Sequence, residues 1–412
     1  MVLFGTGCGD GEIAGMMGHC TGRRAVARRV SGKTETEEGV MGYEEALRRI
    51  EEAKKTGATE LILENQRLTK LPPELFQLTQ LTVLDLNGNN LTALPSEINQ
   101  LTNLTKLGII FNRLFSLPPE LFQLSNLTEL DLSGNGLSTL PPELFEMKQL
   151  TSLGLFGLDL DSLPPELFQL SNLTKLYLGS NWLSTLPPEL FEMKQLTSLG
   201  LDDLNLTSLP PELFHLLKLA ELDLRGNQLT SLPPIISQLI NLTNLNISEN
   251  RLTELPPTII QLTKLTIVNL KGNQLASLPQ EIVQLKKLTR LILSHNQLAE
   301  LPSQIAQLPK LEKLWLHGNP LVSPPLEIVE QGLPAIREYF AEVEGETEEA
   351  AEVKVILMGE GASGKTSLTR CLRGEPFNEN EPTTHGIRIK RWKLACSCRD
   401  LCCNLWDFGG QE

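Results

Sequence analysis

The chain has 412 residues, 41% of which are apolar, and a formal net charge of −14. This length allows two or three domains with a large core, and the acidic balance is a poor match for the phosphates of nucleic acid. No segment approaches the apolar length of a membrane span, and no basic-then-apolar leader opens the sequence, so a cytoplasmic location is expected.

Residues 1–41 are rich in glycine and have little apolar periodicity. They are expected to lack order, or to precede a true start at Met41. Their basic residues are clustered at Arg23, Arg24, Arg28 and Arg29.

A helical pattern then predicts a capping helix within residues 42–60. Tyr43, Leu47 and Ile50 share one helical face, and Gly57 ends the pattern. Such a helix would cover the apolar side of the first repeat, which terminal coils require.

A 23-residue pattern begins at Leu61 and recurs eleven times up to Lys313, and a partial twelfth unit ends near Pro325. This spacing of apolar residues fits neither a helix nor a strand alone, but it fits one coil of a solenoid whose core forms by stacking. The pattern resembles the leucine-rich repeat, which implies repeats over residues 61–325. In one unit the apolar positions are Leu84, Leu86, Leu91, Leu94, Ile98, Leu101 and Leu104.

Most units also contain one asparagine among these apolar positions. A buried amide needs hydrogen-bond partners, so we expect a stacked ladder of asparagines that bond the backbone of the turns. Gln66, Leu158 and Leu204 interrupt it, and drift after duplication of a two-repeat block explains the leucines. The ladder residues are Asn89, Asn112, Asn135, Asn181, Asn227, Asn250, Asn273, Asn296 and Asn319.

The strand positions that should face the concave side are acidic early in the chain and basic late. Tyr177 and Trp315 are aromatic residues among these charges, and we expect them to anchor a protein partner. A face that is only solvated is the alternative.

Residues 326–342 predict a second capping helix that follows Pro324 and Pro325. Residues 343–352 are acidic and poor in apolar residues, as expected of a linker.

Residues 353–412 predict the first part of a nucleotide-binding α/β domain. The strand formers Val353 to Met358 lead into a G-x-x-x-x-G-K-[ST] loop, and a helical pattern follows from Ser367. Lys365 would neutralise the β and γ phosphates, and the Thr366 hydroxyl would bind Mg²⁺. The loop reads Gly359, Glu360, Gly361, Ala362, Ser363, Gly364, Lys365, Thr366.

A second group of motifs follows this loop. A Thr384-His385-Gly386 segment precedes an alternating strand at residues 387–394, and a second apolar run leads into Asp407-Phe408-Gly409-Gly410-Gln411. Asp407 would reach the Mg²⁺ through water, and the Gly410 amide would contact the γ-phosphate. Gln411 would orient the attacking water.

Repeats, capping helix, linker and these motifs, in this order, resemble the Roco family over residues 41–412. In that family leucine-rich repeats precede a Ras-like GTPase domain called Roc. The resemblance implies GTP or GDP with Mg²⁺ as cofactors, signalling through protein partners, and dimerisation through a later domain. It places Thr384 in switch I. The implied Mg²⁺ ligands are Thr366, Thr384 and Asp407, and the implied catalytic residues are Lys365, Thr384 and Gln411.

The sequence departs from the family pattern in two respects. It ends at Glu412, before the guanine-reading Asn/Thr-Lys-x-Asp segment, so we expect weak GTP binding and no measurable hydrolysis by these residues alone. A non-enzymatic interaction scaffold with a vestigial G domain is the alternative. The cysteines also lack the paired C-x₂-C spacing of zinc sites, which favours ordinary strand residues. They are Cys396, Cys398, Cys402 and Cys403.

Overall fold

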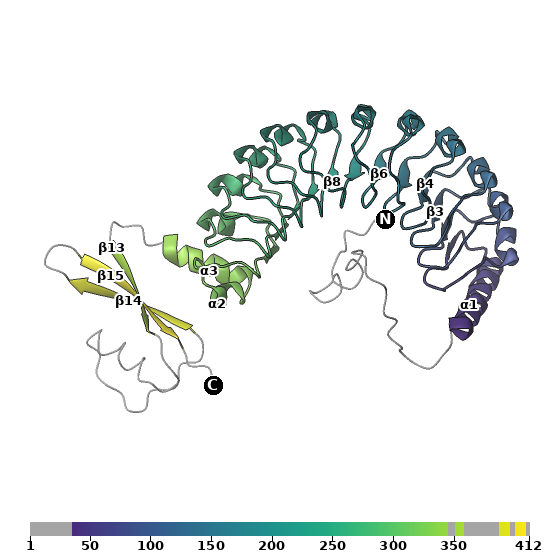
Figure 1. Ribbon diagram of the computed structural model, residues 1–412. Helices are drawn as coiled ribbons and strands as arrows, with labels where there is room; N and C mark the ends of the chain where they lie inside the picture. The colour runs from purple at the N-terminus through teal and green to yellow at the C-terminus, as the bar shows by residue number, and fades with distance from the viewer. Residues whose placement is uncertain (1–34, 345–350, 358–386, 396–399, 409–412) are drawn as a thin grey trace.

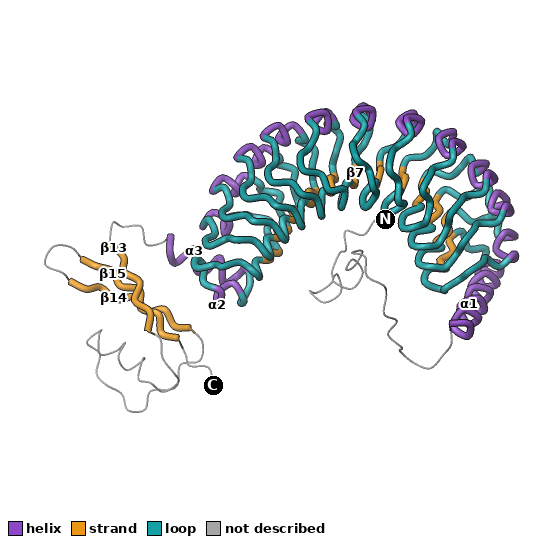
Figure 2. The backbone as a smooth tube through the Cα atoms, viewed as in Figure 1, coloured by secondary structure: helices purple, strands orange, loops and turns teal. Residues whose placement is uncertain are grey.

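The computed structural model describes the backbone of residues 35–344, 351–357, 387–395 and 400–408, and the side chains of residues 42–343 (Figure 1). The repeats form an arc, with short strands on the inner side and short helices on the outer side (Figure 2). Twelve parallel strands pair in chain order, and each register is offset by one 23-residue repeat. The solenoid predicted from the sequence is therefore confirmed.

The inner strands are three residues long, and the middle residue of each points into the core. The strands are β1 Glu60–Ile62, β2 Val83–Asp85, β3 Lys106–Gly108, β4 Glu129–Asp131, β5 Ser152–Gly154, β6 Lys175–Tyr177, β7 Ser198–Gly200, β8 Glu221–Asp223, β9 Asn244–Asn246, β10 Ile267–Asn269, β11 Arg290–Ile292 and β12 Lys313–Trp315.

The outer segments are 3₁₀ helices of five residues, each preceded by a proline in an extended conformation. Proline fixes its own φ and supplies no backbone donor, so it suits the start of such a short turn. The helices are η2 Pro73–Gln77, η3 Ser96–Gln100, η4 Pro119–Gln123, η5 Pro142–Glu146, η6 Pro165–Gln169, η7 Pro188–Glu192, η8 Pro211–His215, η9 Pro234–Gln238, η10 Pro257–Gln261, η11 Gln280–Gln284 and η12 Ser303–Gln307.

The N-terminal cap is helix α1, Glu35–Thr56. It begins earlier than the expected start at residue 42, so residues 35–41 are helical rather than part of an unordered extension. Ala46, Ile50 and Ala53 are buried against the first coil. The Arg49 guanidinium donates to the Ile62 carbonyl at 2.9 Å, which ties the helix to the end of β1.

The C-terminal cap consists of two helices, α2 Leu326–Val329 and α3 Leu333–Glu344, which are separated by Gly332 with φ of 90°. Ile336 and Phe340 are buried. Arg337 donates to carbonyls of the last coil, those of Leu308 at 3.1 Å and Leu311 at 3.0 Å. Both ends of the solenoid are thus covered, as the exposed leucines of terminal coils require.

The asparagine ladder is confirmed, and each amide serves two coils. Asn89 Nδ2 donates at 2.8 Å to the Leu86 carbonyl of its own coil and at 2.8 Å to the Leu63 carbonyl of the preceding coil. Asn89 Oδ1 accepts the Leu68 N–H at 3.0 Å. The Leu86 carbonyl also accepts Nδ2 of Asn112, the next ladder residue, so two amides share one carbonyl.

Leucine replaces asparagine at positions 158 and 204, and in each case the following asparagine accepts one additional backbone N–H, that of the leucine itself. Asn181 Oδ1 accepts the N–H of Leu158 at 3.1 Å as well as that of Leu160 at 3.0 Å. Asn227 bonds Leu204 in the same way. At position 158 the missing amide leaves each of its two carbonyls with another donor, Asn135 for Leu132 and Asn181 for Leu155.

This redundancy is lowest at Asn181, which lies between the two leucine coils. Within the described repeats, it is the only side chain that donates to the Leu155 and Leu178 carbonyls, both at 2.8 Å. Both carbonyls bonded by Asn273, in contrast, also accept the amide of a neighbouring asparagine.

The residue before each ladder position has a positive φ, which costs a non-glycine residue free energy. Glycine and larger residues nearly alternate there, because a larger side chain lies over the glycine of the next coil, as Phe111 does over Gly134. These residues are Asn65, Gly88, Phe111, Gly134, Gly157, Ser180, Asp203, Gly226, Glu249, Gly272, His295 and Gly318.

The three coils without a ladder asparagine share a second left-handed residue. Arg67, Asp159 and Asn205 have φ of 56°, 58° and 57°. Each directly follows the altered ladder position. All three coils therefore share the same altered turn.

The C-terminal segment contains a separate three-stranded sheet of order β13-β15-β14. Its strands are β13 Ala351–Leu357, β14 Ile387–Ala395 and β15 Asp400–Phe408. β13 and β15 are parallel, and β14 pairs with β15 as an antiparallel neighbour. Strands were expected at all three places, although β13 begins within the residues expected to form the linker.

Asn181→Leu should lower the stability of the solenoid much more than Asn273→Leu. The first substitution leaves two buried carbonyls without a side-chain donor, and the second leaves none. An unsatisfied buried group costs about 1–3 kcal/mol, so the difference should be at least about 2 kcal/mol. Urea unfolding of the two variants measures this difference in the free energy of unfolding. Equal decreases in the two variants would show that carbonyl sharing does not explain why coils without a ladder asparagine are tolerated.

Candidate functional site

The predicted nucleotide site lies almost wholly outside the described residues. This applies to Gly359 through Ser367, to Thr384, and to Gly410 and Gln411. Asp407 lies in β15, whose backbone is described.

The backbone nevertheless relates two of the predicted motifs. β13 leads toward the glycine-rich loop, and β15 contains Asp407. In their parallel register Leu357 is the partner of Asp407. The C-terminal end of the strand before the loop is therefore adjacent to the aspartate, at the edge of a parallel pair where α/β proteins place their ligand sites.

Two of the four cysteines also fall on β15. Cys402 and Cys403 belong to this strand, and Cys396 and Cys398 lie outside the described residues. No group of three potential metal ligands occurs among the residues that the structure describes.

The second candidate site is the concave face, where charge is segregated. We call strands β4–β8, with the five residues after each, the acidic segment. It contains two basic residues, Lys175 and Arg225, against seven acidic ones. The corresponding residues of β9–β12 form a basic segment with one acid, Glu249. The seven acids are Glu129, Asp131, Asp159, Asp202, Asp203, Glu221 and Asp223.

Tyr177 lies near the middle of the acidic segment, on β6. Its ring covers Gly200 of the next coil, and its hydroxyl is 3.3 Å from the Ser198 hydroxyl. Ser198 Oγ in turn donates to Glu221 Oε2 at 3.1 Å. Burial raises the pKa of Tyr177, and the carboxylate of Glu221 adds to this increase.

Trp315, the other predicted anchor, lies on β12 in the basic segment. The Lys313 ammonium is 5.8 Å from the centre of its ring, within cation–π range. Five strands lie between β6 and β12, so the structure does not bring Tyr177 and Trp315 together.

Three other aromatic side chains are far more exposed. Phe111, Phe115 and Trp182 expose 60%, 73% and 70% of their surface. The Trp182 indole Nε1 donates to Asp159 Oδ1 of the preceding coil at 3.0 Å. The sequence pattern could have identified them, because Phe111 and Trp182 directly flank ladder asparagines, at positions that turn away from the core.

Asp202 is a strongly perturbed carboxyl group on this face. Its side chain lies over Gly179 of the preceding coil. Burial is the main cause that raises its pKa to about 7, and the charge of Asp223 adds to it. Burial also raises the pKa of Asp131 and Asp223. The acidic segment therefore holds carboxylates whose negative charge is costly in the absence of a cation.

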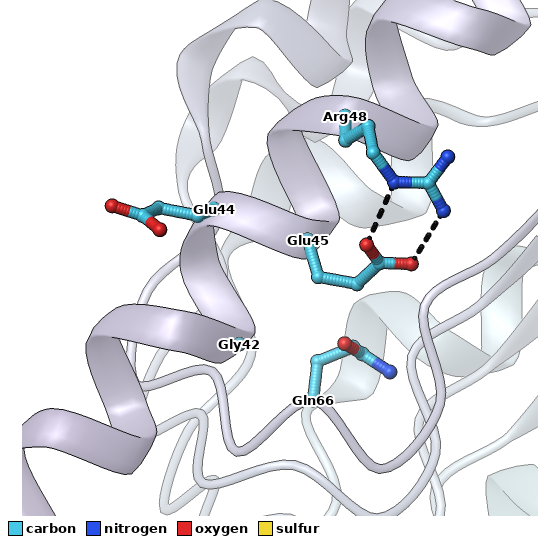
Figure 3. Close-up of a pocket in the computed structure, with 5 residues that line it drawn as sticks. All are labelled: Gly42, Glu44, Glu45, Arg48 and Gln66. Carbon is cyan, nitrogen blue, oxygen red and sulfur yellow. Dashed lines mark hydrogen bonds and ion pairs between the residues drawn. The ribbon is translucent and has the colours of Figure 1, made fainter.

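A hollow of about 560 Å³ lies beside α1, lined by Gly42, Glu44, Glu45, Arg48 and Gln66 (Figure 3). Arg48 and Arg49 both bond the Glu45 carboxylate at 2.8 Å. These hydrogen bonds, that of Arg48 first, lower the pKa of Glu45 to about 2. The charges of Glu45 and Arg48 in this hollow are already paired with each other, and the Glu44 side chain points away from this pair (Figure 3).

Comparison with protein families identifies both parts of the chain. A model described as leucine rich repeat matches residues 56–114, 102–160, 194–252, 240–298 and 263–321, which together span more than half of the chain. A second leucine-rich-repeat model matches residues 172–193. The model described as Ras of Complex, Roc, domain of DAPkinase matches residues 354–412.

Individual relatives agree with this division. ADP-ribosylation factor-like protein alp41 of Schizosaccharomyces pombe is 38% identical over 61 residues, 15% of this chain and 30% of alp41. The chain thus spans less than a third of that relative.

Solved structures resemble the repeats. A leucine-rich-repeat protein of Leptospira interrogans is 36% identical with a TM-score of 0.52, over 67% of this chain and 82% of that one. The Arabidopsis receptor kinase HAESA, solved with the peptide hormone IDA and the co-receptor SERK1, is 30% identical with a TM-score of 0.52, over 65% and 51%. No helix in the described ranges is long and apolar enough to cross a membrane.

Asp202→Asn should stabilise the protein at alkaline pH and have little effect near pH 4. The raised native pKa means that wild type loses stability as the pH rises from about 4 to about 7, because only the native carboxyl still binds its proton there. Denaturant unfolding gives the free energy of unfolding of the variant and of wild type at pH 4.5 and at pH 8. The variant's advantage over wild type should be larger at pH 8 than at pH 4.5 by roughly 1–3 kcal/mol. Glu143→Gln, at an exposed outer position, is the control, and a difference that does not change with pH would contradict the assignment.

Proposed function

We propose a function for this chain from the premise that it belongs to the leucine-rich-repeat proteins and that a Roc segment follows its repeats, as in Roco proteins. In this proposal the chain is a cytoplasmic signalling protein. Its C-terminal segment binds GTP or GDP with Mg²⁺, and its repeats bind protein partners.

The adjacent ends of β13 and β15 are the observation that supports the nucleotide site most directly. They bring the approach to the glycine-rich loop beside Asp407, an arrangement that phosphate-loop proteins use to hold a nucleotide and its metal. Loop amides and Lys365 would hold the phosphates, and Thr366, Thr384 and Asp407 would hold Mg²⁺. Bound Mg²⁺ would neutralise charge that develops on the phosphates.

Guanine is favoured over adenine because Gln411 follows the Asp-x-x-Gly motif, as in Ras-like GTPases. Gln411 would orient the attacking water, and Gly410 would sense the γ-phosphate through its amide. The relative alp41, an ADP-ribosylation factor-like protein, supports the same nucleotide class.

Protein binding on the repeats is supported by the concave surface and by HAESA, which was solved with a peptide hormone and a co-receptor. Tyr177 and Trp315 remain our proposed anchors at the acidic and basic segments. The two residues are six strand spacings apart, or about 29 Å at the usual spacing. One partner must therefore span several coils to contact both.

The competing function is an interaction scaffold whose G segment binds no nucleotide. It rests on the repeats alone, whose family model spans more than half of the chain. Nucleotide titration separates the two functions.

Isothermal titration of residues 1–412 with Mg²⁺ and GTP, GDP, GMP or ATP should show weak binding of GTP and GDP and none of GMP, because the loop contacts the β and γ phosphates. Lys365→Ala should lower the affinity for GTP at least about tenfold, since it removes the charge that pairs with those phosphates.

Gln411→Leu is the matched control, because it alters the proposed water-positioning residue and should leave nucleotide affinity unchanged. Absence of binding by every nucleotide would favour the scaffold. Equal affinity for GMP and GTP would contradict a phosphate-loop site.

A further inference from the structure

The exposed aromatic residues and the acidic segment meet at one place on the solenoid. We infer that coils 3–8 bind a basic segment of another protein, with an arginine side chain held between Phe111 and Phe115 on one side and Trp182 on the other. This inference deepens the proposed protein-binding role of the repeats and is independent of the nucleotide site.

The slot is formed by side chains that lean toward each other. Phe111 lies over Gly134, and Phe115 lies over Gly136, so both rings reach from the third coil over the fourth. Trp182 reaches back from the sixth coil, where its indole bonds Asp159 of the fifth. The third and sixth strands are about 14 Å apart at the usual spacing, and the rings narrow that gap from both sides.

The floor of the slot is open at Gly157. A Cβ atom placed on this glycine would have its nearest neighbour at 3.9 Å, whereas one placed on Gly134 would collide with the Phe111 ring. A flat or extended side chain can therefore enter at the fifth coil. Three large, exposed aromatic residues around one opening are also unusual on a surface that is otherwise polar, and such clusters mark binding sites.

The surrounding charge is mostly acidic and favours a cation, with Arg113, between Phe111 and Phe115 in the chain, as a basic exception. Asp159 lies beside Trp182, and Asp131 covers the neighbouring Gly154 of the concave face. Lys106 pairs with Glu129 at 3.1 Å, so one acid of the acidic segment already has a cation. The excess of acids over bases in this segment makes it complementary to a basic partner.

Arginine fits this slot better than lysine. Its flat guanidinium stacks on aromatic rings and at the same time donates to carboxylates, whereas the lysine ammonium is a compact, strongly hydrated charge. The basic segment begins at β9, so a partner that extends toward the C-terminal end of the arc should carry acidic residues there. The charge reversal thus also sets the direction in which the partner lies.

Fluorescence anisotropy with labelled twelve-residue peptides tests the inference on the full chain. The peptides carry four arginines, four lysines or four glutamates, separated by glycine and serine. The arginine peptide should bind most tightly and the glutamate peptide should not bind. Trp182→Ala should weaken binding of the arginine peptide about fivefold, in line with loss of a cation–π contact. Ile240→Ala removes an exposed apolar side chain in the turn after η9, outside the slot, and should leave binding unchanged.

A charge-matched pair distinguishes a site from the overall negative charge. Asp131→Asn with Asp223→Asn should weaken binding strongly. Glu143→Gln with Glu189→Gln removes the same charge from the outer 3₁₀ helices η5 and η7 and should have little effect. Equal effects of the two pairs, or equal effects of Trp182→Ala and Ile240→Ala, would overturn the inference.

The basic cluster of the chain itself is the remaining occupant to test. A variant in which Arg23, Arg24, Arg28 and Arg29 are all changed to Ser should bind the arginine peptide as wild type does. If that variant instead binds the peptide more tightly, the chain occupies its own acidic segment, and the inference of a separate partner is wrong.

Discussion

The sharing of one carbonyl between two asparagine amides is the interaction on which the solenoid depends. A buried carbonyl needs a donor, and in six of the described coils it receives one from the asparagine of its own coil and another from that of the next coil, as the Leu86 carbonyl does. The arrangement makes each coil depend on its neighbours, which is how a structure without a single compact core becomes cooperative. It also supplies spare donors, so an isolated coil can lose its asparagine.

This tolerance has a structural consequence near the proposed binding surface. The coils with Leu158 and Leu204 adopt a second left-handed residue just after the altered position. In the first of them this residue is Asp159, whose carboxylate holds the Trp182 indole. The same near-alternation of glycine and larger residues lets Phe111 lie over Gly134. Residues next to the ladder positions can therefore vary and hold aromatic side chains at the surface, while the core leucines stay in place.

Much of the fold follows from the sequence because it repeats. The spacing of leucines predicted the coils, the buried asparagines predicted the ladder, and the glycine-rich loop after a run of strand formers predicted β13. The start of α1 at Glu35 was not predicted, because residues 35–41 lack the apolar face that marks the rest of the helix. The sharing of Asn181 between two N–H groups was also missed, since it depends on how adjacent coils stack rather than on any one residue.

The candidate sites divide in the same way. Motif order led to the proposed nucleotide residues, of which Asp407 alone lies in the described backbone, as the register partner of Leu357. On the repeats, composition suggested Tyr177 and Trp315, but exposure identifies Phe111, Phe115 and Trp182. The exposure of a side chain depends on the turn in which the residue lies. The 23-residue period alone does not predict which aromatic side chains are exposed.

Amide hydrogen exchange tests the central role of the ladder most directly. The N–H groups of Leu114 and Leu252 donate to ladder asparagines, and those of Leu137 and Leu183 face positions where leucine has replaced the asparagine. If the ladder stabilises the coils, the N–H groups of Leu137 and Leu183 should exchange at least about tenfold faster than those of Leu114 and Leu252. This is the effect of losing one hydrogen bond worth about 1.4 kcal/mol. Equal protection of all four amides, despite their different partners, would contradict this role of the ladder.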